Sequence, residues 1–416
     1  MNVWICIAYD PLPGIDHTTR LLRYGTLAEQ LAEHGHNVVL WTSTYDHWRK
    51  SQRFDHDQSV TLSPGLRVEL LHAPAYRRNI SLTRLRHNRT LAYKFAARAR
   101  STARPDVIFA GIPCLELTEA AVSYARENGV PVAADVQDVW PEVYATILPR
   151  PIRPLGRLIL HREFTRARRI FRNSTSVTAV SHQYLSWAQE VRGGAGAHDA
   201  VFHLGYRFPA ADVIAAAKAG EAEFRARIRL PADRNLALFL GQFAASYDIE
   251  TIIAAARILS SSARNLQFVL AGAGDKMERV QRAAAGLETV TLTGWLDYRD
   301  TLTLLQSAHI GLAAYARRAP QSLPYKPFEY MAFGLPIIGS LGGELRELIE
   351  AQGLGAWYQA GDATSLAGAV LALASSPEQR AFASRRCKEL FASRYDALLI
   401  TRQLIAHLDQ LTRTTR

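Results

Sequence analysis

The chain has 416 residues, which favours two domains of about 200 residues each over a single core. Hydrophobic residues make up 48% of the chain and no low-complexity tract interrupts it, which excludes fibrous and disordered proteins. Its apolar stretches are shorter than the roughly 18–20 residues that cross a bilayer, which excludes a membrane-spanning protein. Cys6, Cys114 and Cys387 are too scattered for a disulfide framework or a metal site. We therefore expect a globular, cytoplasmic protein whose first residues form a strand rather than a leader peptide.

The net charge of +11 is unevenly spread along the chain. Residues 77–104 hold nine Lys or Arg and no acid, and residues 150–172 hold eight Arg with Glu163 as the one acid. Such an excess favours an anionic partner: nucleic acid, an acidic lipid surface or a phosphorylated substrate. A solvated helix face would explain either run by itself. No nucleic-acid recognition motif accompanies the charge, so we do not expect a nucleic-acid partner.

Short β-rich apolar runs alternate with helical patterns along the whole chain. Between the first two runs, for example, Leu27 and Leu31 share a helix face and Gly35 ends the helix. The alternation predicts an α/β protein of two doubly wound, Rossmann-like domains that face each other across a cleft. The domains are expected at residues 1–207 and 208–390, with a C-terminal helix at residues 391–416 that packs back toward the first. The predicted strands are residues 2–9, 37–44, 106–112, 130–136, 176–181, 200–206, 236–242, 266–272, 290–294, 309–316 and 336–340.

Two glycine turns follow predicted strands, and in such sheets ligands bind beyond the carboxyl ends of the strands. Gly14, in DPLPGIDHTTR, can bring backbone N–H groups close to a phosphate, and Gly274, in AGAGD, permits a similar approach. For each, an ordinary tight turn is an equally good interpretation. Neither turn has the G-x-G-x-x-G pattern, so a nicotinamide or flavin cofactor is not expected.

The segment DVQDVWPE places three acids and a tryptophan at the end of a buried strand. Asp135, Asp138 and Glu142 can accept hydrogen bonds from sugar hydroxyls or assist a proton transfer, and Trp140 offers an apolar ring face. In the alternative interpretation, Asp138 caps a helix and Trp140 belongs to the core.

The segment QSLPYKPFEYMAFGLPII, residues 321–338, places Lys326 and Glu329 at a helix N-terminus after a strand. A carboxylate there suits the two vicinal hydroxyls of a ribose, and a lysine beside a helix start suits a diphosphate. A capping glutamate on an ordinary helix is the alternative. A second glycine-rich helix start, Gly342-Gly343, follows the next strand.

These segments resemble the donor-binding signature of retaining, family 4 type glycosyltransferases with the GT-B fold, in particular those of bacterial capsule, O-antigen and exopolysaccharide assembly. The resemblance covers almost the whole chain. The other segments that carry it are GTLAEQLAEHGHNVVLWTS, VPVAADVQDVWPE, FVLAGAGDK and VTLTGWLDY.

The resemblance implies a nucleotide-sugar donor held by residues 208–390 and an acceptor held by residues 1–207. Glu329 takes the position that binds ribose, and Gln321 the position that contacts the transferred sugar. For catalysis the expected residues are Gln321, Asp138 and Lys326; for donor binding Gly14, Glu329, Gln242, Gly274, Trp295, Leu296, Arg317, Arg318, Gly342 and Gly343; for acceptor binding Trp140, Glu142, Asp135 and His17.

Two departures from the family pattern concern charge. Gln321 stands where the family usually has a glutamate, and GQFAASYD puts Gln242 and Tyr247 at or near an Arg/Lys pair that usually clamps the diphosphate. Each lost charge-assisted bond is often worth ~1.5–3 kcal/mol. Either other cations compensate, or the donor binds weakly or is unusual, or activity is lost. The candidate cations are Lys326, Arg317, Arg318 and Arg20.

The implied reaction is transfer of a hexose, with retention, from a nucleoside diphosphate sugar to a hydroxyl of a glycan acceptor, itself polyprenyl-diphosphate-linked, in bacterial surface polysaccharide synthesis. No D-x-D lies on a suitable loop and no histidine cluster is present, so neither a metal nor another cofactor is expected. A GT-B nucleotide-sugar 2-epimerase and a catalytically silent glycan- or nucleotide-binding subunit are the alternatives. The sequence specifies no oligomeric state.

Residues 77–104 also fit a helix on an anionic membrane surface, with basic residues around an apolar face. That would make the protein peripheral on the inner face of the cell membrane. In the alternative, the apolar face packs on the first domain and the arginines point to water. The face is formed by Leu82, Leu85, Leu91, Ala92 and Phe95.

Overall fold

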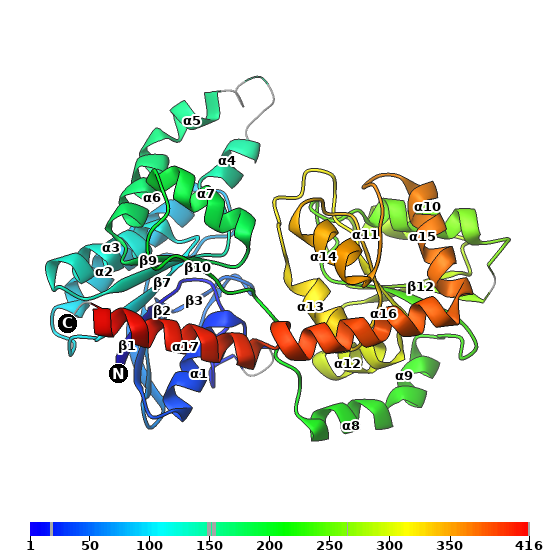
Figure 1. Cartoon of the computed structure of the whole chain (residues 1–416), viewed down its shortest axis with the longest axis horizontal. Helices are drawn as coiled ribbons and strands as arrows, with labels where there is room; N and C mark the ends of the chain where they lie inside the picture. The colour runs from blue at the N-terminus through cyan, green and yellow to red at the C-terminus, as the bar shows by residue number, and fades with distance from the viewer. Residues whose placement is uncertain (17–19, 148–150, 152–154, 264, 415–416) are drawn as a thin grey trace. The chain divides into compact units, whose positions relative to one another are not determined.

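The computed structural model describes residues 1–16, 20–147, 151, 155–263 and 265–414. It divides into two compact units, one formed by Met1–His203 together with the chain from Leu398 onward, and one formed by Leu204–Ala397. Each unit is a largely parallel sheet with helices on both faces (Figure 1). The predicted α/β class with two Rossmann-like sheets is confirmed.

The first unit is built on an eight-stranded sheet in the order β10-β9-β8-β7-β1-β2-β6-β5. Every neighbouring pair is parallel except β5 and β6, which are antiparallel. The strands are β1 (Asn2–Cys6), β2 (Asn37–Ser43), β5 (Gln58–Ser63), β6 (Leu66–Leu71), β7 (Val107–Ile112), β8 (Val132–Val136), β9 (Ser176–Ala179) and β10 (Ala200–Val201), with a separate ribbon of β3 (Tyr45–Asp46) and β4 (Ser51–Gln52).

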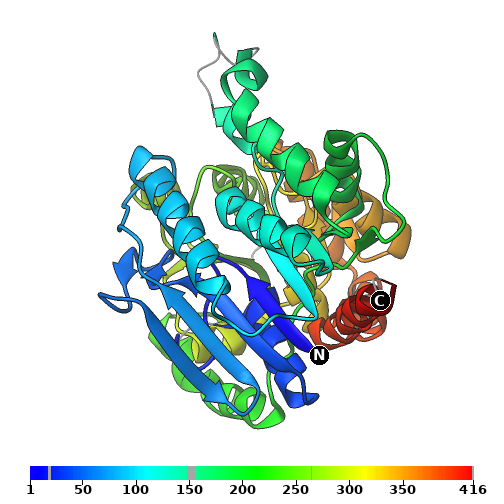
Figure 2. The same cartoon turned by 90° about the vertical axis from the view of Figure 1, so that its left-hand side faces the viewer.

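Two pairs of helices cover the faces of this sheet. On one face α1 (Arg23–Glu33) and α17 (Ala397–Thr414) share a core, to which they contribute Leu31 and Leu408. On the other lie α2 (Leu82–Ala99) and α3 (Leu115–Glu127), seen in Figure 2. The Phe95 ring of α2 packs edge-on to Trp41 of β2. The remaining helices of the unit are α4 (Glu142–Ile147), α5 (Gly156–Ile159), α6 (His161–Asn173) and α7 (His182–Arg192).

The second unit has a fully parallel six-stranded sheet in the order β13-β12-β11-β14-β15-β16. Its strands are β11 (Asn235–Leu240), β12 (Leu266–Ala271), β13 (Val290–Gly294), β14 (Ile310–Ala313), β15 (Ile337–Gly339) and β16 (Gly355–Trp357). Its helices are α8 (Ala211–Ala219), α9 (Glu221–Arg227), α10 (Ile249–Leu259), α11 (Met277–Ala284), α12 (Tyr298–Ser307), α13 (Tyr325–Ala332), α14 (Glu344–Gln352), α15 (Ala363–Ser375) and α16 (Pro377–Leu390), followed by a π-helical turn, η2 (Phe391–Tyr395).

All eleven predicted strands are present, but the β5–β6 hairpin and the short β16 were not predicted. In β5, QSVTLS, the residues alternate between exposed and half-buried, so the strand lacks the apolar run that marks the others. β16 has only three residues. No helix in the described parts of the chain is long and apolar enough to cross a membrane.

The apolar face that we expected on a membrane surface is divided between the interior and the surface of the first unit. Leu91 and Phe95 are buried, as in the alternative interpretation, whereas Leu82 is 84% exposed. Arg84 and Asn88 are buried in its place, because they lie seven and three residues before Leu91 and therefore on the same side of the helix.

Candidate active site

In the second unit, the start of α13 brings Lys326 to the carboxyl end of β11. Its Nζ atom donates a hydrogen bond to the hydroxyl of Tyr247 at 3.1 Å and lies 4.2 Å from the centre of that ring. A Cβ atom on Gly241 would come within 2.3 Å of the same Nζ atom. Lys326 thus places a cation in the loop GQFAASYD, where the family pattern led us to expect an Arg/Lys pair.

Glu329 lies one turn further along α13, on the same side of the helix as Lys326. Its side chain is largely buried, with 9% exposed, between Phe328 and Tyr330, which are fully buried. Burial, and after it the nearby charge of Glu329, raise the pKa of Tyr330 well above its ordinary value. A carboxylate at this edge of the sheet can accept hydrogen bonds from the hydroxyl groups of a ligand.

The loops after β11 and β12 pack backbone against backbone. The Phe243 amide donates to the Ala273 carbonyl at 2.9 Å, and a Cβ atom on Gly274 would meet the Phe243 carbonyl oxygen at 2.8 Å. With its φ angle of 154°, Gly274 is therefore required by the loop itself. This close packing supports the interpretation that the glycines of AGAGD are needed for a tight turn.

The glycine pair before α14 has a different environment. Gly343 is the N-cap residue and has a φ angle of 61°, which favours glycine. Gly342 has ordinary backbone angles, and a Cβ atom built on it would meet nothing within 4 Å. Nothing in the described part of the fold therefore requires glycine at position 342.

The other predicted donor residues of this unit lie at the same edge of the sheet. Trp295 is 70% exposed after β13, with Leu296 half-buried beside it. In Gln321 the Oε1 atom is buried and accepts no hydrogen bond from any described residue. Gln242, Arg317 and Arg318 are exposed.

In the first unit, the structure places Asp135 in the core rather than on a binding surface. The residue is fully buried. Its carboxylate accepts hydrogen bonds from Arg23 at 2.9 and 3.0 Å, from the Tyr24 hydroxyl at 2.9 Å and from the Thr178 hydroxyl at 2.6 Å. Both oxygens are therefore occupied, and the geometry favours a structural role over the predicted contact with the acceptor.

Asp138 and Trp140 follow β8 and lie near the surface. Burial raises the pKa of Asp138 to about 6, although a hydrogen bond with Trp140 and the charge of Arg84 pull it down. The Trp140 ring stands edge-on to Tyr144 at 4.0 Å, and the Arg84 guanidinium lies 5.1 Å from its centre.

The remaining predicted residues of the first unit are Glu142, Gly14 and His17. Glu142 is half-buried at the start of α4. Gly14 is exposed and has a φ angle of 65°, as either a phosphate-binding turn or an ordinary one requires. His17 lies outside the described residues.

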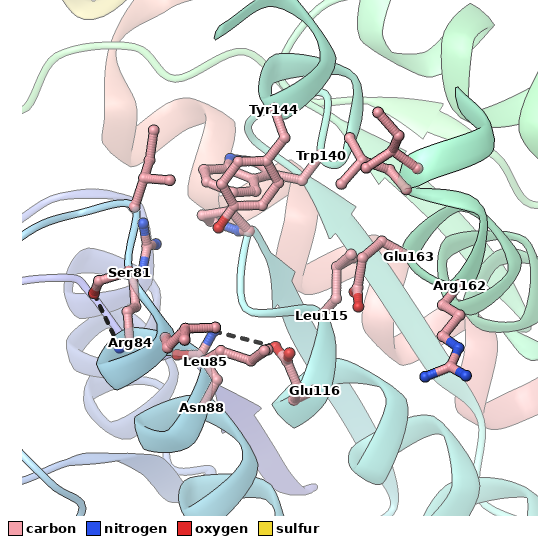
Figure 3. A pocket seen from close by; sticks show the side chains of 15 residues that line it. Ser81, Arg84, Leu85, Asn88, Leu115, Glu116, Trp140, Tyr144, Arg162 and Glu163 are labelled. Atoms are coloured by element: carbon pink, nitrogen blue, oxygen red, sulfur yellow. Dashed lines mark hydrogen bonds between the residues drawn. The ribbon is translucent and has the colours of Figure 1, made fainter. Parts of the chain in front are cut away.

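A cavity of about 640 Å³ opens beside Trp140 (Figure 3). Its lining includes Arg84, Asn88 and Glu116, which sequence reasoning had not singled out as site residues. The available signal was the four-residue spacing of Arg84 and Asn88, which puts two polar side chains on the buried face of α2.

Two α/β units with parallel sheets, each with polar loops at the carboxyl ends of its strands, define the GT-B fold. Residues 23–205 match the family described as glycosyl transferase 4-like domain, and residues 220–389 match the family described as glycosyl transferases group 1. The two halves of the chain are therefore glycosyltransferase domains.

Individual relatives agree with this assignment. Alpha-D-kanosaminyltransferase from Streptomyces kanamyceticus is 28% identical over 181 residues, which are 43% of this chain and 46% of that protein, so the match spans about half of the relative's length. Among solved structures, sucrose-phosphate synthase from Thermosynechococcus elongatus is similar with a TM-score of 0.74 at 19% identity, over 99% of both chains. HepE from Anabaena in complex with UDP-glucose has a TM-score of 0.67 at 15% identity, over 99% of this chain and 100% of that one. At these identities the solved structures bear on the fold alone.

Proposed function

We propose that the protein is a retaining glycosyltransferase that moves a hexose from a nucleoside diphosphate sugar to a hydroxyl of a lipid-linked glycan in bacterial surface polysaccharide synthesis. The observation that carries this proposal is the pairing of Lys326 and Glu329 on one side of α13, at the carboxyl edge of the second sheet. A cation and a carboxylate about one helical turn apart match a diphosphate and a ribose, which adjoin each other in such a donor.

In this proposal, Glu329 accepts hydrogen bonds from the ribose hydroxyls, and Trp295 and Leu296 lie beside the base. Lys326 and the amides at the start of α14 meet the diphosphate. Exposed cations and glycine turns complete that binding: Arg317, Arg318, Gly14, Gly274, Gly342 and Gly343, with Gln242 as a neutral donor. On the acceptor side we place Trp140, Glu142 and His17.

During transfer, negative charge grows on the leaving diphosphate and positive charge on the sugar ring. Lys326 and the helix-start amides stabilise the leaving group, which is the main source of acceleration in sites of this kind. The departing phosphate oxygen lies on the same face as the incoming hydroxyl and takes its proton, so the anomeric configuration is retained without a side-chain nucleophile. The open Oε1 of Gln321 accepts a hydrogen bond from the transferred sugar, and Asp138 accepts a hydrogen bond from a hydroxyl of the acceptor and orients it. The proposed reaction uses no metal ion.

A silent nucleotide-binding subunit is the second candidate, because Gln242 and Tyr247 replace two expected cations. A 2-epimerase is the third. Incubation with UDP, GDP and dTDP sugars, with and without a lipid extract, distinguishes them. Acceptor-dependent release of nucleoside diphosphate supports transfer, release together with free sugar in the absence of acceptor supports the epimerase, and binding without turnover supports the silent subunit.

The donor site is tested by Glu329→Gln, which keeps the size of the side chain but removes its charge. We expect the dissociation constant of the nucleoside diphosphate to rise about tenfold or more, since a bond to a charged acceptor is worth more than ~1 kcal/mol. Glu288→Gln is the matched control, because Glu288 is exposed in the same unit and lies in the turn before β13, at the amino end of that strand. Isothermal titration calorimetry measures both, and an unchanged affinity in Glu329→Gln would remove the proposed role.

We also propose that the first unit associates with the inner face of the cell membrane through residues 77–104. On α2, Leu82, Tyr93, Arg86 and Arg89 are exposed together. This mixture of apolar and basic side chains suits an anionic headgroup layer.

A further inference from the structure

The cavity beside Trp140 lies wholly within the first unit, among four segments of the chain (Figure 3). Residues at the start of α2 and the start of α3 form one side, and Trp140, Tyr144 and the α5–α6 junction form the other. Its volume of about 640 Å³ falls in the range of small-molecule sites, roughly 300–1,000 Å³.

Most of the cavity wall is apolar, and part of the apolar surface faces water. Leu82 is 84% exposed, Ile159 54% and Ile80 51%, and all three line the cavity. Leu85, Leu115 and Leu160 extend the same surface inward. A hydrocarbon chain lying along these side chains would remove that surface from water, which is favourable by roughly 25 cal/mol per Å².

One polar residue in this wall is a buried arginine that forms no ion pair with a described residue. Arg84 is only 6% exposed and forms no ion pair with any residue that the structure describes. Its guanidinium donates to the Tyr9 hydroxyl at 3.3 Å and to the Asn79 carbonyl at 2.7 Å, and it lies over the Tyr9 and Trp140 rings. Because a buried charge is costly without an anion, a ligand that brings an anionic group to Arg84 gains the missing pair.

The two acids that line the cavity are already compensated. Glu116 and Glu163 both contact Arg166, at 3.3 and 2.5 Å, and Asn88 donates a hydrogen bond to Glu116 at 3.1 Å. Arg162 also lines the cavity, is exposed, and forms no ion pair within the described ranges. Among the described residues that line the cavity, Arg84 and Arg162 are therefore the cations without an ion pair.

From this combination we propose that the cavity binds the phosphate-bearing end of the acceptor lipid. Its phosphate or diphosphate pairs with Arg84 and Arg162, and the first hydrocarbon units of its chain lie against Leu82, Leu85 and Ile159. The occupant is the acceptor lipid rather than a bulk phospholipid, because Trp140 and Asp138 on the β8 loop belong to the proposed acceptor site. This inference rests on the proposed function and names the residues that would recognise its acceptor.

Direct binding tests the proposal without turnover. The probe is farnesyl diphosphate below its micelle concentration, compared by calorimetry with farnesol, inorganic diphosphate and dihexanoyl phosphatidylglycerol. We expect farnesyl diphosphate to bind at least ten times more tightly than each of the other three. Equal binding of inorganic diphosphate, or tighter binding of the phospholipid, would overturn the assignment to an acceptor lipid.

Two substitutions test the residues. Leu82→Asp should weaken farnesyl diphosphate binding at least tenfold, and since the side chain is exposed the fold should be unaffected. Tyr93→Asp is its matched control on the same helix, because Tyr93 is 77% exposed and does not line the cavity. Arg84→Gln should abolish the preference for farnesyl diphosphate over farnesol, whereas Arg89→Gln should not. Thermal melting checks that each variant is folded.

Failure of the cavity proposal can be distinguished from failure of the proposed function. UDP binding is measured on the same preparations, and it should be unchanged in Leu82→Asp. If UDP binds but no variant alters lipid binding, or no lipid binds, the cavity proposal fails while the donor assignment stands. If UDP and its sugars fail to bind but farnesyl diphosphate binds as expected, the donor assignment fails and the lipid site stands.

Discussion

Asp135 illustrates, at the scale of single residues, what a sequence leaves open. A carboxylate at the end of a strand is expected at the surface, and three acids in eight residues strengthen that expectation. The partner that keeps Asp135 inside is Arg23, 112 residues earlier in the chain, at the start of α1. Only the fold brings the two together, whereas the roles proposed for Lys326 and Glu329 depend on neighbours within one helix and were therefore accessible from the sequence.

The Arg23–Asp135 pair yields a stability prediction. Asp135→Ala leaves a buried guanidinium without its counter-charge, so the free energy of unfolding should fall by about 3–5 kcal/mol. Urea denaturation measures the change. The double variant Arg23→Met with Asp135→Leu removes both charges and should be considerably more stable than Asp135→Ala. Equal losses in the two would show that the unpaired guanidinium is not what destabilises Asp135→Ala.

Asp138 gives a pH dependence. Because burial raises its pKa from 3.8 to about 6, the folded state holds the proton more tightly than the unfolded one, and stability from this group falls as pH rises from about 4 to about 6. Asp138→Asn removes that loss. The difference in free energy of unfolding between Asp138→Asn and the parent should therefore grow by roughly 2–3 kcal/mol, in favour of the variant, from pH 4 to pH 7. Denaturation at both pH values measures it.

The control for this effect is Asp233→Asn, because Asp233 is exposed in the second unit. Asp10, whose pKa burial raises to about 7, is present in all three proteins and cancels in the comparison. A difference between Asp138→Asn and the parent that does not change with pH would contradict the raised pKa.

At the scale of elements, apolar periodicity predicted well which helices and strands exist. It predicted less well which face of a helix is buried. The parallel strands are buried on both sides and appear as continuous apolar runs, so they were found. The inner face of α2 was not recognised because Arg84 and Asn88 are polar. They are buried only because Tyr9, Glu116 and Trp140 meet them from other elements. A helix considered alone carries no sign of such partners.

A substitution at the start of α14 tests whether this helix belongs to the proposed donor site. Gly342→Ala adds one methyl group where the fold leaves open space, so stability should change by less than about 0.5 kcal/mol. If a phosphate approaches the amides there, the methyl group intrudes on it, and the dissociation constant of the nucleoside diphosphate should rise about tenfold. Calorimetry and thermal melting measure the two effects. Unchanged binding in a fully stable variant would remove Gly342 from the donor site.

At the scale of the whole molecule, the alternation of strands and helices was enough to predict two α/β units, because it recurs over hundreds of residues. The cavity beside Trp140 was not predictable in the same way. Its walls come from four segments between Ile80 and Glu163, and their convergence depends on how α2, α3 and α6 pack. Net charge, in contrast, can be read from the sequence, and the membrane binding that it predicts can be tested on the intact chain.

The uneven charge predicts salt-dependent binding to acidic membranes. Exposed basic residues near headgroups contribute about 1 kcal/mol each, and salt screens them. Vesicles with an acidic lipid should therefore float the protein at low salt and release it as salt rises, whereas neutral vesicles should not bind it. Arg86→Glu with Arg89→Glu should weaken binding at least tenfold. Arg385→Glu with Arg394→Glu changes net charge equally on the second unit, where both arginines are exposed, and should have a much smaller effect. Equal loss in both pairs would mean that overall charge, and not residues 77–104, drives the association.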